Sequence, residues 1–256
     1  MAVTISLAGK NAIITGAGKG IGAAIAKRLA QADANLVLIS RTLADLELVA
    51  TEIRSDTSVK VLPVVCDVSK PEEINRAVSE AEQIFGNIDI LVNNAGVNYR
   101  ETAFNVDVDH WDTVMNTNLK GYFLMSKAVA KGMVKRKSGV IVNIGSELSF
   151  VGVAEGQVAY STSKAAVNQL GRVLAAEWAS YKIRVNTVVP GFTETELVTE
   201  LLNKPGYKKK FEQEIPLNRL ATPGNVADAV LFMASDASAF TTGTTLLVDG
   251  GYTNIR

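Results

Sequence analysis

A glycine-rich turn directly after the first apolar segment constrains this chain more than any other feature. Residues 11–15 predict a buried strand, and four glycines follow between residues 16 and 22, where a predicted helix begins. Glycines let a backbone turn sharply and approach a phosphate, and a helix N-terminus offers unpaired N–H groups to an anion. The turn therefore predicts an anion-binding site, although glycines at this place could also serve only to pack the helix against the strand.

Apolar segments alternate with helical patterns along the whole chain. Continuously apolar strands suit a parallel sheet that is covered on both faces. We therefore predict one α/β domain with a Rossmann-type, doubly wound parallel sheet. An eight-fold barrel is disfavoured because the glycine turn follows the first strand. The predicted strands are residues 11–15, 35–40, 59–66, 88–93, 139–145, 183–188 and 245–248, and the predicted helices are 20–31, 42–54, 71–85, 107–131, 158–180 and 225–234.

Composition excludes several classes of protein. The 256 residues carry no net charge, so nothing favours binding to nucleic acid or to an anionic membrane. We expect a cytoplasmic location, since no apolar run reaches the ~20 residues of a membrane span and the first residues do not resemble a signal peptide. Cys66 is the only cysteine and His110 the only histidine. We expect no disulfide and no metal, and a structural or surface role for His110 at the start of a helix.

A tyrosine and a lysine occur four positions apart in the predicted helix 158–180. Positions i and i+4 share one helix face, so Tyr160 and Lys164 should lie side by side. A neighbouring cation lowers the pKa of a phenol and makes it usable in acid–base catalysis near neutral pH. The pair alone is also compatible with an ordinary surface helix.

The end of the second predicted strand bears on the choice of dinucleotide. An acidic residue at this place typically binds the ribose 2′-OH of NAD(H), whereas an arginine accommodates the 2′-phosphate of NADP(H). The chain has Arg41 here, and Lys19 adds a second cation within the glycine turn. These residues favour NADP(H), unless Arg41 is only a solvated residue before the next helix.

Taken in order, residues 15–22, residues 93–96, Ser146, Tyr160 and Lys164 make the chain resemble the short-chain dehydrogenase/reductase family along essentially its whole length. The resemblance implies a Rossmann-type sheet of about seven strands, a nicotinamide cofactor, and a homotetramer or homodimer. The helices at 107–131 and 158–180 match those with which relatives dimerise.

The same resemblance implies a role for each matching residue. Tyr160 corresponds to the proton donor in carbonyl reduction and Lys164 to the residue that lowers its pKa. Ser146 corresponds to the hydroxyl that polarises the substrate carbonyl, and Asn118 to the residue that holds a proton-relay water. The residues matched to cofactor binding are Gly16, Gly18, Lys19, Gly20, Ile21, Gly22, Arg41, Asp67, Val68, Asn94, Ala95, Gly96, Tyr160, Lys164, Pro190, Gly191 and Thr193.

One departure from the family pattern affects the substrate pocket. Ser146 and Tyr160 are one position further apart than is usual, so the loop between them carries an extra residue. Ser149 is too close to Tyr160 in sequence to replace Ser146. We expect a pocket lined by polar side chains, including Asn98, Glu147 and Gln157, and by apolar ones, with a substrate lid at about residues 191–217.

The sequence therefore predicts an NADP(H)-dependent reductase of a small dicarbonyl, a ketose or a similar ketone. The glycine turn and the residues around Arg41 resemble dicarbonyl/L-xylulose reductases. The same pattern resembles 3-oxoacyl-(acyl carrier protein) reductases, for which Lys135, Arg136 and Lys137 could contact an acidic carrier protein. This cluster is more typical of a solvated helix end, since cations favour a helix C-terminus. A protein that senses nucleotides without catalysis is a third alternative, and the complete set of expected catalytic residues disfavours it.

Overall fold

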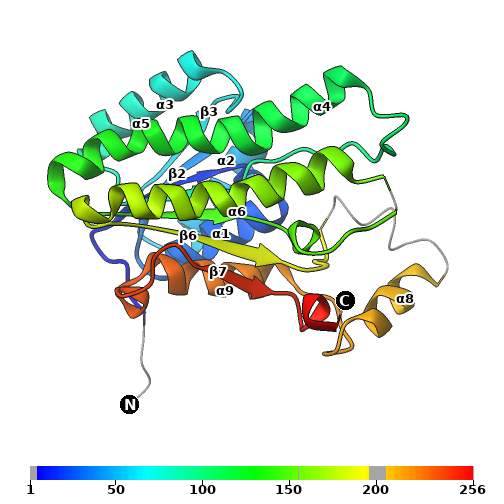
Figure 1. The fold of residues 1–256 in the computed structure, drawn as a ribbon. Helices are drawn as coiled ribbons and strands as arrows, with labels where there is room; N and C mark the ends of the chain where they lie inside the picture. Colours follow the sequence, from blue (N-terminus) through cyan, green and yellow to red (C-terminus); the bar gives the residue numbers. More distant parts are fainter. Residues whose placement is uncertain (1–4, 155, 196–205, 256) are drawn as a thin grey trace.

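The computed structural model describes residues 5–154, 156–195 and 206–255 of the chain. Within these residues, seven strands form one parallel sheet in the order β3-β2-β1-β4-β5-β6-β7 (Figure 1). The predicted doubly wound fold is confirmed. The strands are β1 (Asn11–Thr15), β2 (Asn35–Ser40), β3 (Val61–Val65), β4 (Ile90–Asn93), β5 (Gly139–Ile144), β6 (Ile183–Pro190) and β7 (Thr245–Val248).

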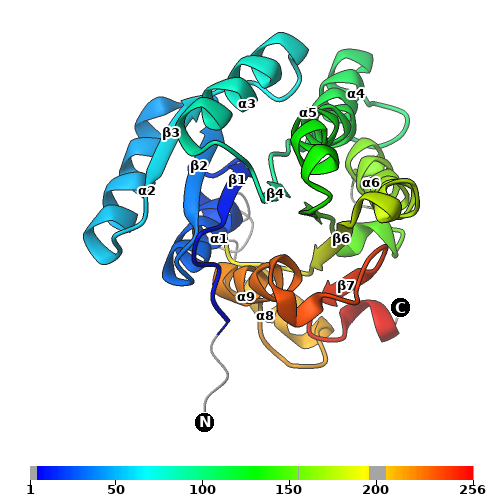
Figure 2. The ribbon, with the colours of Figure 1, turned by 90° about the vertical axis from the view of Figure 1, so that its left-hand side faces the viewer.

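Helices cover both faces of the sheet (Figure 2). Helices α1 (Gly20–Gln31), α2 (Leu43–Asp56) and α9 (Pro223–Ala234) pack on one face, and α3 (Pro71–Phe85), α5 (Gly121–Arg136) and α6 (Val158–Trp178) pack on the other. Ile13 and Ile14 are consecutive in β1, yet they belong to opposite cores. Both faces are buried, which explains why the strands are continuously apolar. None of the helices in the described parts of the chain combines the length and apolar character that crossing a membrane requires.

The strand order reverses between β1 and β4. The chain runs from β1 to β2 and β3 in one direction, and β4 pairs with the other side of β1. Ligands of such sheets bind outside the carboxyl ends of the strands at this switch point. The ends of β1, β4, β5 and β6 carry the residues that the sequence assigned to the site, so the topology brings distant motifs to one edge.

The main difference from the predicted elements lies in the long helix expected at residues 107–131. The structure has α4 (Val108–Met115), a π-helical turn η1 (Asn116–Lys120), and then α5. Such a turn inserts one extra residue into an otherwise continuous helix, and a pattern interpreted as one long helix does not show where the insertion lies. Turns of this kind are frequent at functional sites, and Asn118 lies in the middle of this one.

Within the described part of the predicted lid region, the structure has one short helix. Helix α8 (Tyr207–Glu214) lies at the end of the molecule toward which β6 and β7 point (Figure 1), and residues 196–205 lie outside the described residues. Phe192 contacts Phe211 of α8 at 4.4 Å between ring centroids and Tyr252 of the C-terminal turn η5 (Tyr252–Ile255) at 5.2 Å. This aromatic cluster joins α8 to the C-terminal segment.

We predict that Gly22→Ala destabilises the fold. A Cβ atom at Gly22 would lie 2.1 Å from the Gly16 carbonyl oxygen and 2.6 Å from Asn94 Nδ2. Because the first obstacle is backbone, the strand and helix must separate. The free energy of unfolding, measured by urea denaturation, should fall by about 2–3 kcal/mol.

Gly152→Ala is the matched control. A Cβ atom at Gly152 meets no heavy atom within 4 Å, and its φ is not in the left-handed region. Its free energy of unfolding should stay within about 0.5 kcal/mol of the parent protein. Equal stability of the two variants would contradict the close packing of β1 against α1.

Candidate active site

The glycine turn adopts backbone conformations that favour glycine. Gly16 and Gly20 have φ angles of +65° and +57°. Residues with a Cβ atom adopt such angles only at a cost in free energy. The first turn of α1 contains no acidic residue, and its N-cap residue, Lys19, makes no side-chain capping hydrogen bond. The N–H groups of this turn and the helix dipole therefore favour an anion. Ile21, which is partly buried, packs against the core.

A second turn, after β4, is bonded to the first. The amide of Asn94 donates to the carbonyl oxygens of Thr15 (3.0 Å) and Gly16 (3.1 Å), and the Thr15 hydroxyl accepts from the backbone N–H groups of Asn94 and Ala95. Gly96 follows at the approach to the predicted catalytic residues. Asn94 and Ala95 thus brace the predicted phosphate site, while their contact with a dinucleotide stays a prediction.

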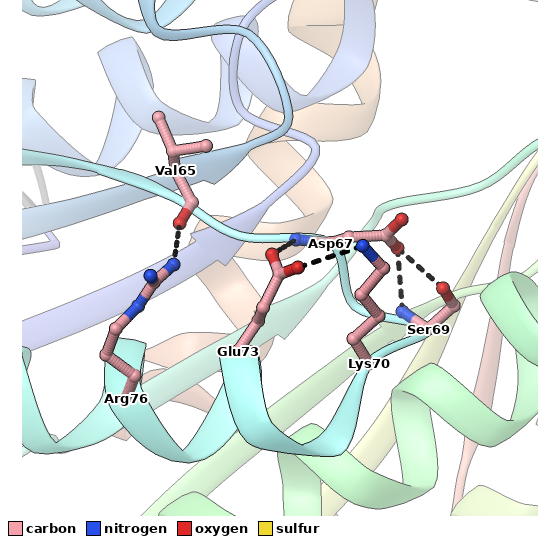
Figure 3. Close-up of polar contacts among 6 residues, drawn as sticks. All are labelled: Val65, Asp67, Ser69, Lys70, Glu73 and Arg76. Carbon is pink, nitrogen blue, oxygen red and sulfur yellow. Dashed lines mark hydrogen bonds and ion pairs between the residues drawn. The ribbon is translucent and has the colours of Figure 1, made fainter.

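Asp67 lies in a polar network after β3 (Figure 3). Its backbone N–H donates to Glu73 (2.8 Å), which also pairs with Lys70 (3.1 Å), and its carboxylate accepts from the backbone and hydroxyl of Ser69 at 2.9 and 2.8 Å. Partial burial raises the pKa of Asp67, but the Ser69 hydrogen bonds and the charges of Arg41 and Lys70 outweigh this and lower it. The carboxylate is therefore ionised and fixed in orientation, while its contact with an adenine edge stays a prediction.

The two cations predicted near the adenosine ribose differ in their surroundings. Arg41 is exposed at the end of β2, and its charge reaches Asp67. Lys19 lies 3.4 Å from Asp45 of α2, so part of its charge is balanced by that carboxylate. Val68, which was also matched to cofactor binding, is buried, with 6% of its surface exposed. Arg41 is therefore the better placed of the two cations for a 2′-phosphate.

The segment after β6 is tightly held. The backbone N–H of Gly191 donates to the Val248 carbonyl at 3.0 Å, and a Cβ atom at Gly191 would lie 2.7 Å from the Asp249 Cα. The Thr193 hydroxyl donates to the Gly191 carbonyl at 2.8 Å. Pro190 ends β6 beside this turn. These residues lie on the same edge as the glycine turn, in agreement with their expected place.

Lys164 is buried, with 3% of its surface exposed, and links α6 to the end of β5. Its Nζ donates to the Ile144 carbonyl at 2.8 Å and to the Tyr122 hydroxyl at 3.2 Å. The Nζ lies 5.7 Å from the centroid of the Tyr160 ring. Burial lowers the pKa of Lys164 to about 7. The predicted pair is thus brought together, although the ammonium is bonded to other groups.

The side chain of Asn118 clamps the loop after β4. Its Oδ1 accepts from the Val97 N–H at 2.8 Å, and its Nδ2 donates to the Val97 carbonyl at 2.9 Å and to the Ser163 hydroxyl at 3.2 Å. Asn118 is fully buried. Since its amide is occupied by these contacts, its role in holding a relay water stays a prediction.

Ser146 lies at the end of β5 and adjoins a buried carboxyl group. Its hydroxyl donates to Glu147 Oε2 at 2.8 Å. The hydroxyl of Ser149 already makes two hydrogen bonds: it donates to the Ser146 carbonyl and accepts from Asn168 Nδ2 at 2.8 Å. The structure therefore keeps Ser146, and not Ser149, as the candidate for polarising a carbonyl.

The expected lowering of the pKa of Tyr160 is not what the structure shows. Burial raises this pKa above its ordinary value, the charge of Glu147 raises it further, and a hydrogen bond with Ser146 only partly opposes them. Lys164, itself desolvated, is not among the causes that shift the pKa of Tyr160. Tyr160 is therefore held in its protonated form, which is the form that donates a proton.

Sequence reasoning missed two contacts at the site. Tyr122 was not singled out, although it follows Asn118 by four residues on the same side of the helix, which is the signal that could have found it. His110, expected in a surface or structural role, stacks on Tyr99 with ring centroids 3.9 Å apart, and its Nδ1 lies 2.9 Å from Glu101 Oε1. This cluster organises the loop beside the predicted pocket.

A cavity of about 440 Å³ opens at the amino ends of the strands, and it contains none of the predicted site residues. The candidate site is defined instead by the side chains that converge at the carboxyl ends. Among the described residues, no group of three or more His, Cys, Asp or Glu side chains is arranged to hold a metal ion.

Known proteins of similar sequence share this fold and chain length. A family model described as enoyl-(acyl carrier protein) reductase matches residues 16–253. Galactitol 2-dehydrogenase (L-tagatose-forming) of Cereibacter sphaeroides is 40% identical over 249 residues, with 96% of each chain covered. A 3-oxoacyl-(acyl carrier protein) reductase of Aquifex aeolicus is 37% identical over 247 residues, covering 96% of this chain and 98% of the relative. A crystal structure of gluconate 5-dehydrogenase from Burkholderia cenocepacia, in complex with NADP and tartrate, has a TM-score of 0.93 and 35% identity, covering 98% of each chain.

The fold and the converging side chains define an oxidoreductase that acts on CH–OH and C=O groups with a nicotinamide cofactor. The chain belongs to the short-chain dehydrogenase/reductase family. The family resemblance inferred from the sequence is confirmed.

We predict that Glu147 makes stability depend on pH. Burial raises the pKa of Glu147 from 4.5 to about 7, so between these values the folded state binds more protons than the unfolded state. Stability contributed by the protonated carboxyl is complete below pH 4.5 and is lost as pH rises through 7. As the pH rises from 4.5 to about 7, the free energy of unfolding of Glu147→Gln should rise by on the order of 2–3 kcal/mol relative to that of the parent protein.

Urea denaturation at a series of pH values measures this difference. Subtracting the curve of one protein from that of the other removes the contributions of all other titrating groups to the free energy of unfolding, because both proteins share those groups. Glu177, which is exposed on α6, provides the control, and Glu177→Gln should follow the parent curve. Parallel curves for the parent and Glu147→Gln would show that Glu147 titrates normally.

Proposed function

We propose that the protein is an NADP(H)-dependent oxidoreductase that reduces a small ketone, such as a dicarbonyl or a ketose, to a secondary alcohol. The observation that carries the proposal is the convergence of Ser146, Tyr160 and Lys164 at the carboxyl edge of the sheet, beside an anion-binding helix start. The polar side chains Glu147 and Gln157, buried near them, support a hydroxylated substrate.

The residues of this chain supply the proton and stabilise charge. A reduced nicotinamide held at the glycine turn and near residues 190–193 would supply the hydride. Negative charge then develops on the carbonyl oxygen, where the Ser146 and Tyr160 hydroxyls can donate hydrogen bonds. Tyr160 transfers its proton to this oxygen, because its raised pKa keeps it protonated beforehand. Lys164 positions the end of β5 against α6.

Removal of the phenol should abolish most of the activity. We predict that Tyr160→Phe lowers kcat for ketone reduction by about 10²–10⁴-fold, because the general acid is lost. Consumption of NADPH is followed by its absorbance with a panel of diketones, ketoses and 3-oxoacyl thioesters. NADPH binding, measured by fluorescence, should persist.

Tyr181→Phe is the matched control, since Tyr181 is exposed in the turn after α6 and away from the site. It should retain the parent kcat. Full activity of Tyr160→Phe would refute Tyr160 as the proton donor. Turnover of none of the ketones by the parent protein, with nucleotide binding intact, would instead favour the non-catalytic, nucleotide-sensing alternative.

The preference for NADP(H) rests on Arg41. It is exposed at the end of β2, where the ribose 2′-phosphate is expected, and Asp67 lies near enough to feel its charge. We predict that Arg41→Ala weakens NADPH binding by about 1.5–3 kcal/mol, since one charge-assisted contact is lost, and leaves NADH binding nearly unchanged. Isothermal titration with each cofactor measures the difference.

Arg28→Ala removes a partly exposed arginine that pairs with Asp228 near the far end of α1. This control should bind both cofactors as the parent protein does. Equal losses of NADPH and NADH affinity in Arg41→Ala would overturn the assignment of Arg41 to the 2′-phosphate.

Reduction of a 3-oxoacyl-(acyl carrier protein) is the second candidate. The Aquifex aeolicus relative and the description of the family model favour it. The basic cluster at residues 135–137 does not favour this candidate, because it lies at the C-terminal end of α5, where Arg136 donates to the Ile88 carbonyl before β4. This cluster therefore lies at the opposite edge of the sheet from the site. The 3-oxoacyl thioester in the ketone panel separates the two candidates.

We further propose that residues 191–217 act as the substrate lid and that the protein forms a homo-oligomer, tetrameric or else dimeric. Helices α5 and α6 lie side by side on one face (Figure 1), and the partly exposed Phe123 and Val173 on them offer apolar surface. Light scattering at known concentration measures the number of subunits. A cytoplasmic location remains the expectation from the sequence.

A further inference from the structure

The carboxyl group of Glu147 is buried directly beside the candidate catalytic hydroxyl. Glu147 begins the short turn η2 (Glu147–Ser149), and only 6% of its surface is exposed. Its Oε2 accepts the hydrogen bond from the Ser146 hydroxyl at 2.8 Å. In the residues that the structure describes, no cationic side chain pairs with it. A buried acid without a cation is uncommon, and its place next to reacting groups calls for a functional reason.

The electrostatic surroundings do not favour a charge on Glu147. Burial raises its pKa to about 7, and Asp249 adds to this effect. Hydrogen bonds from Ser146 and from the backbone of Glu147 and Leu148 lower the pKa only in part. A further hydrogen-bond donor would therefore stabilise the ionised form considerably.

The contact with Ser146 conflicts with the proposed chemistry. A serine hydroxyl has one hydrogen, and the Glu147 carboxylate at 2.8 Å competes for it with the neighbouring oxygen of Tyr160. The same hydrogen is needed for the carbonyl oxygen of the substrate. Ser146 can donate to the substrate without leaving the Glu147 carboxylate short of a hydrogen bond only if another donor takes its place on that carboxylate.

We propose that Glu147 is a specificity-determining residue that accepts a hydrogen bond from a hydroxyl on the carbon next to the reacting carbonyl. The inference rests on the proposed function and narrows its substrate class to α-hydroxy ketones, which include ketoses. The substrate hydroxyl replaces Ser146 on Glu147, and Ser146 then donates to the carbonyl oxygen. A 3-oxoacyl chain has a methylene at that carbon and leaves the carboxylate without a donor.

A second buried acceptor supports a polyhydroxylated substrate. Gln157 precedes Tyr160 by three residues, and its Oε1 accepts from Asn98 Nδ2 at 2.9 Å. The Oδ1 atom of Asn98 is buried and accepts no hydrogen bond from the residues described. A buried oxygen of this kind is normally paired, so a substrate hydroxyl is a suitable donor for it too.

The test compares two ketones that differ by a single hydroxyl, 1-hydroxy-2-butanone and 2-butanone. For the parent protein we expect kcat/KM to favour the hydroxy ketone by about 100-fold or more, because a site built to bind a hydroxyl rejects an analogue without it. In Glu147→Leu this ratio should fall to near unity, chiefly through loss of activity with the hydroxy ketone. Glu147→Gln keeps the size of the side chain and an acceptor oxygen, so its ratio of kcat/KM for the two ketones should be intermediate. It is the variant to measure if Glu147→Leu fails to fold.

Glu177→Gln is the control and should keep the parent ratio. If both Glu147 variants lower kcat/KM equally for the two ketones, Glu147 acts on Ser146 or on the fold and the proposal is overturned. Equal activity of the parent protein with both ketones overturns it as well, while the proposed function stands. Absence of turnover with every ketone would instead overturn the proposed function, and this inference with it.

Discussion

The ammonium group of Lys164, buried at the end of β5, is the constraint on which the site depends. Its hydrogen bond to the Ile144 carbonyl fixes α6 against the sheet. Tyr160 lies one helical turn before Lys164, and Ser146 follows Ile144 by two residues, so one contact brings these three side chains to the same place. Burying the ammonium costs free energy, which is why its pKa falls to about 7. Such costs are retained where function requires them.

The surroundings of Tyr160 determine the form in which it is available. Burial and the neighbouring Glu147 both disfavour the phenolate, so the hydroxyl keeps its proton. A protonated phenol suits the reduction of a carbonyl, whereas the oxidation of an alcohol needs the phenolate. Glu147 thus has two effects at one site: it raises the pKa of Tyr160, and it accepts the hydrogen bond of Ser146, for which a substrate would compete under our proposal.

The fold, and the placing of the candidate residues at one edge of the sheet, could be predicted because they depend on local patterns. Apolar segments fixed the strands, and β1 and β2 have the predicted bounds. Strand ends of a parallel sheet share one edge, so the motifs on them could be assigned to one site. The sign of the pKa shift at Tyr160 was wrong, because spacing along a helix reveals a neighbouring cation but not the desolvation of both groups. The roles of Glu147 and Tyr122 also depend on packing between β5, α5 and α6, which no local pattern encodes.

The protonation state of Tyr160 can be measured by the ultraviolet absorbance of tyrosinate. Titrating the parent protein and Tyr160→Phe in parallel, and subtracting the two curves, isolates the ionisation of this one phenol. We predict that the difference remains absent at neutral pH and develops only above pH 10, the ordinary pKa of a tyrosine. A phenolate already present near neutral pH would contradict the conclusion that the site holds Tyr160 as a proton donor.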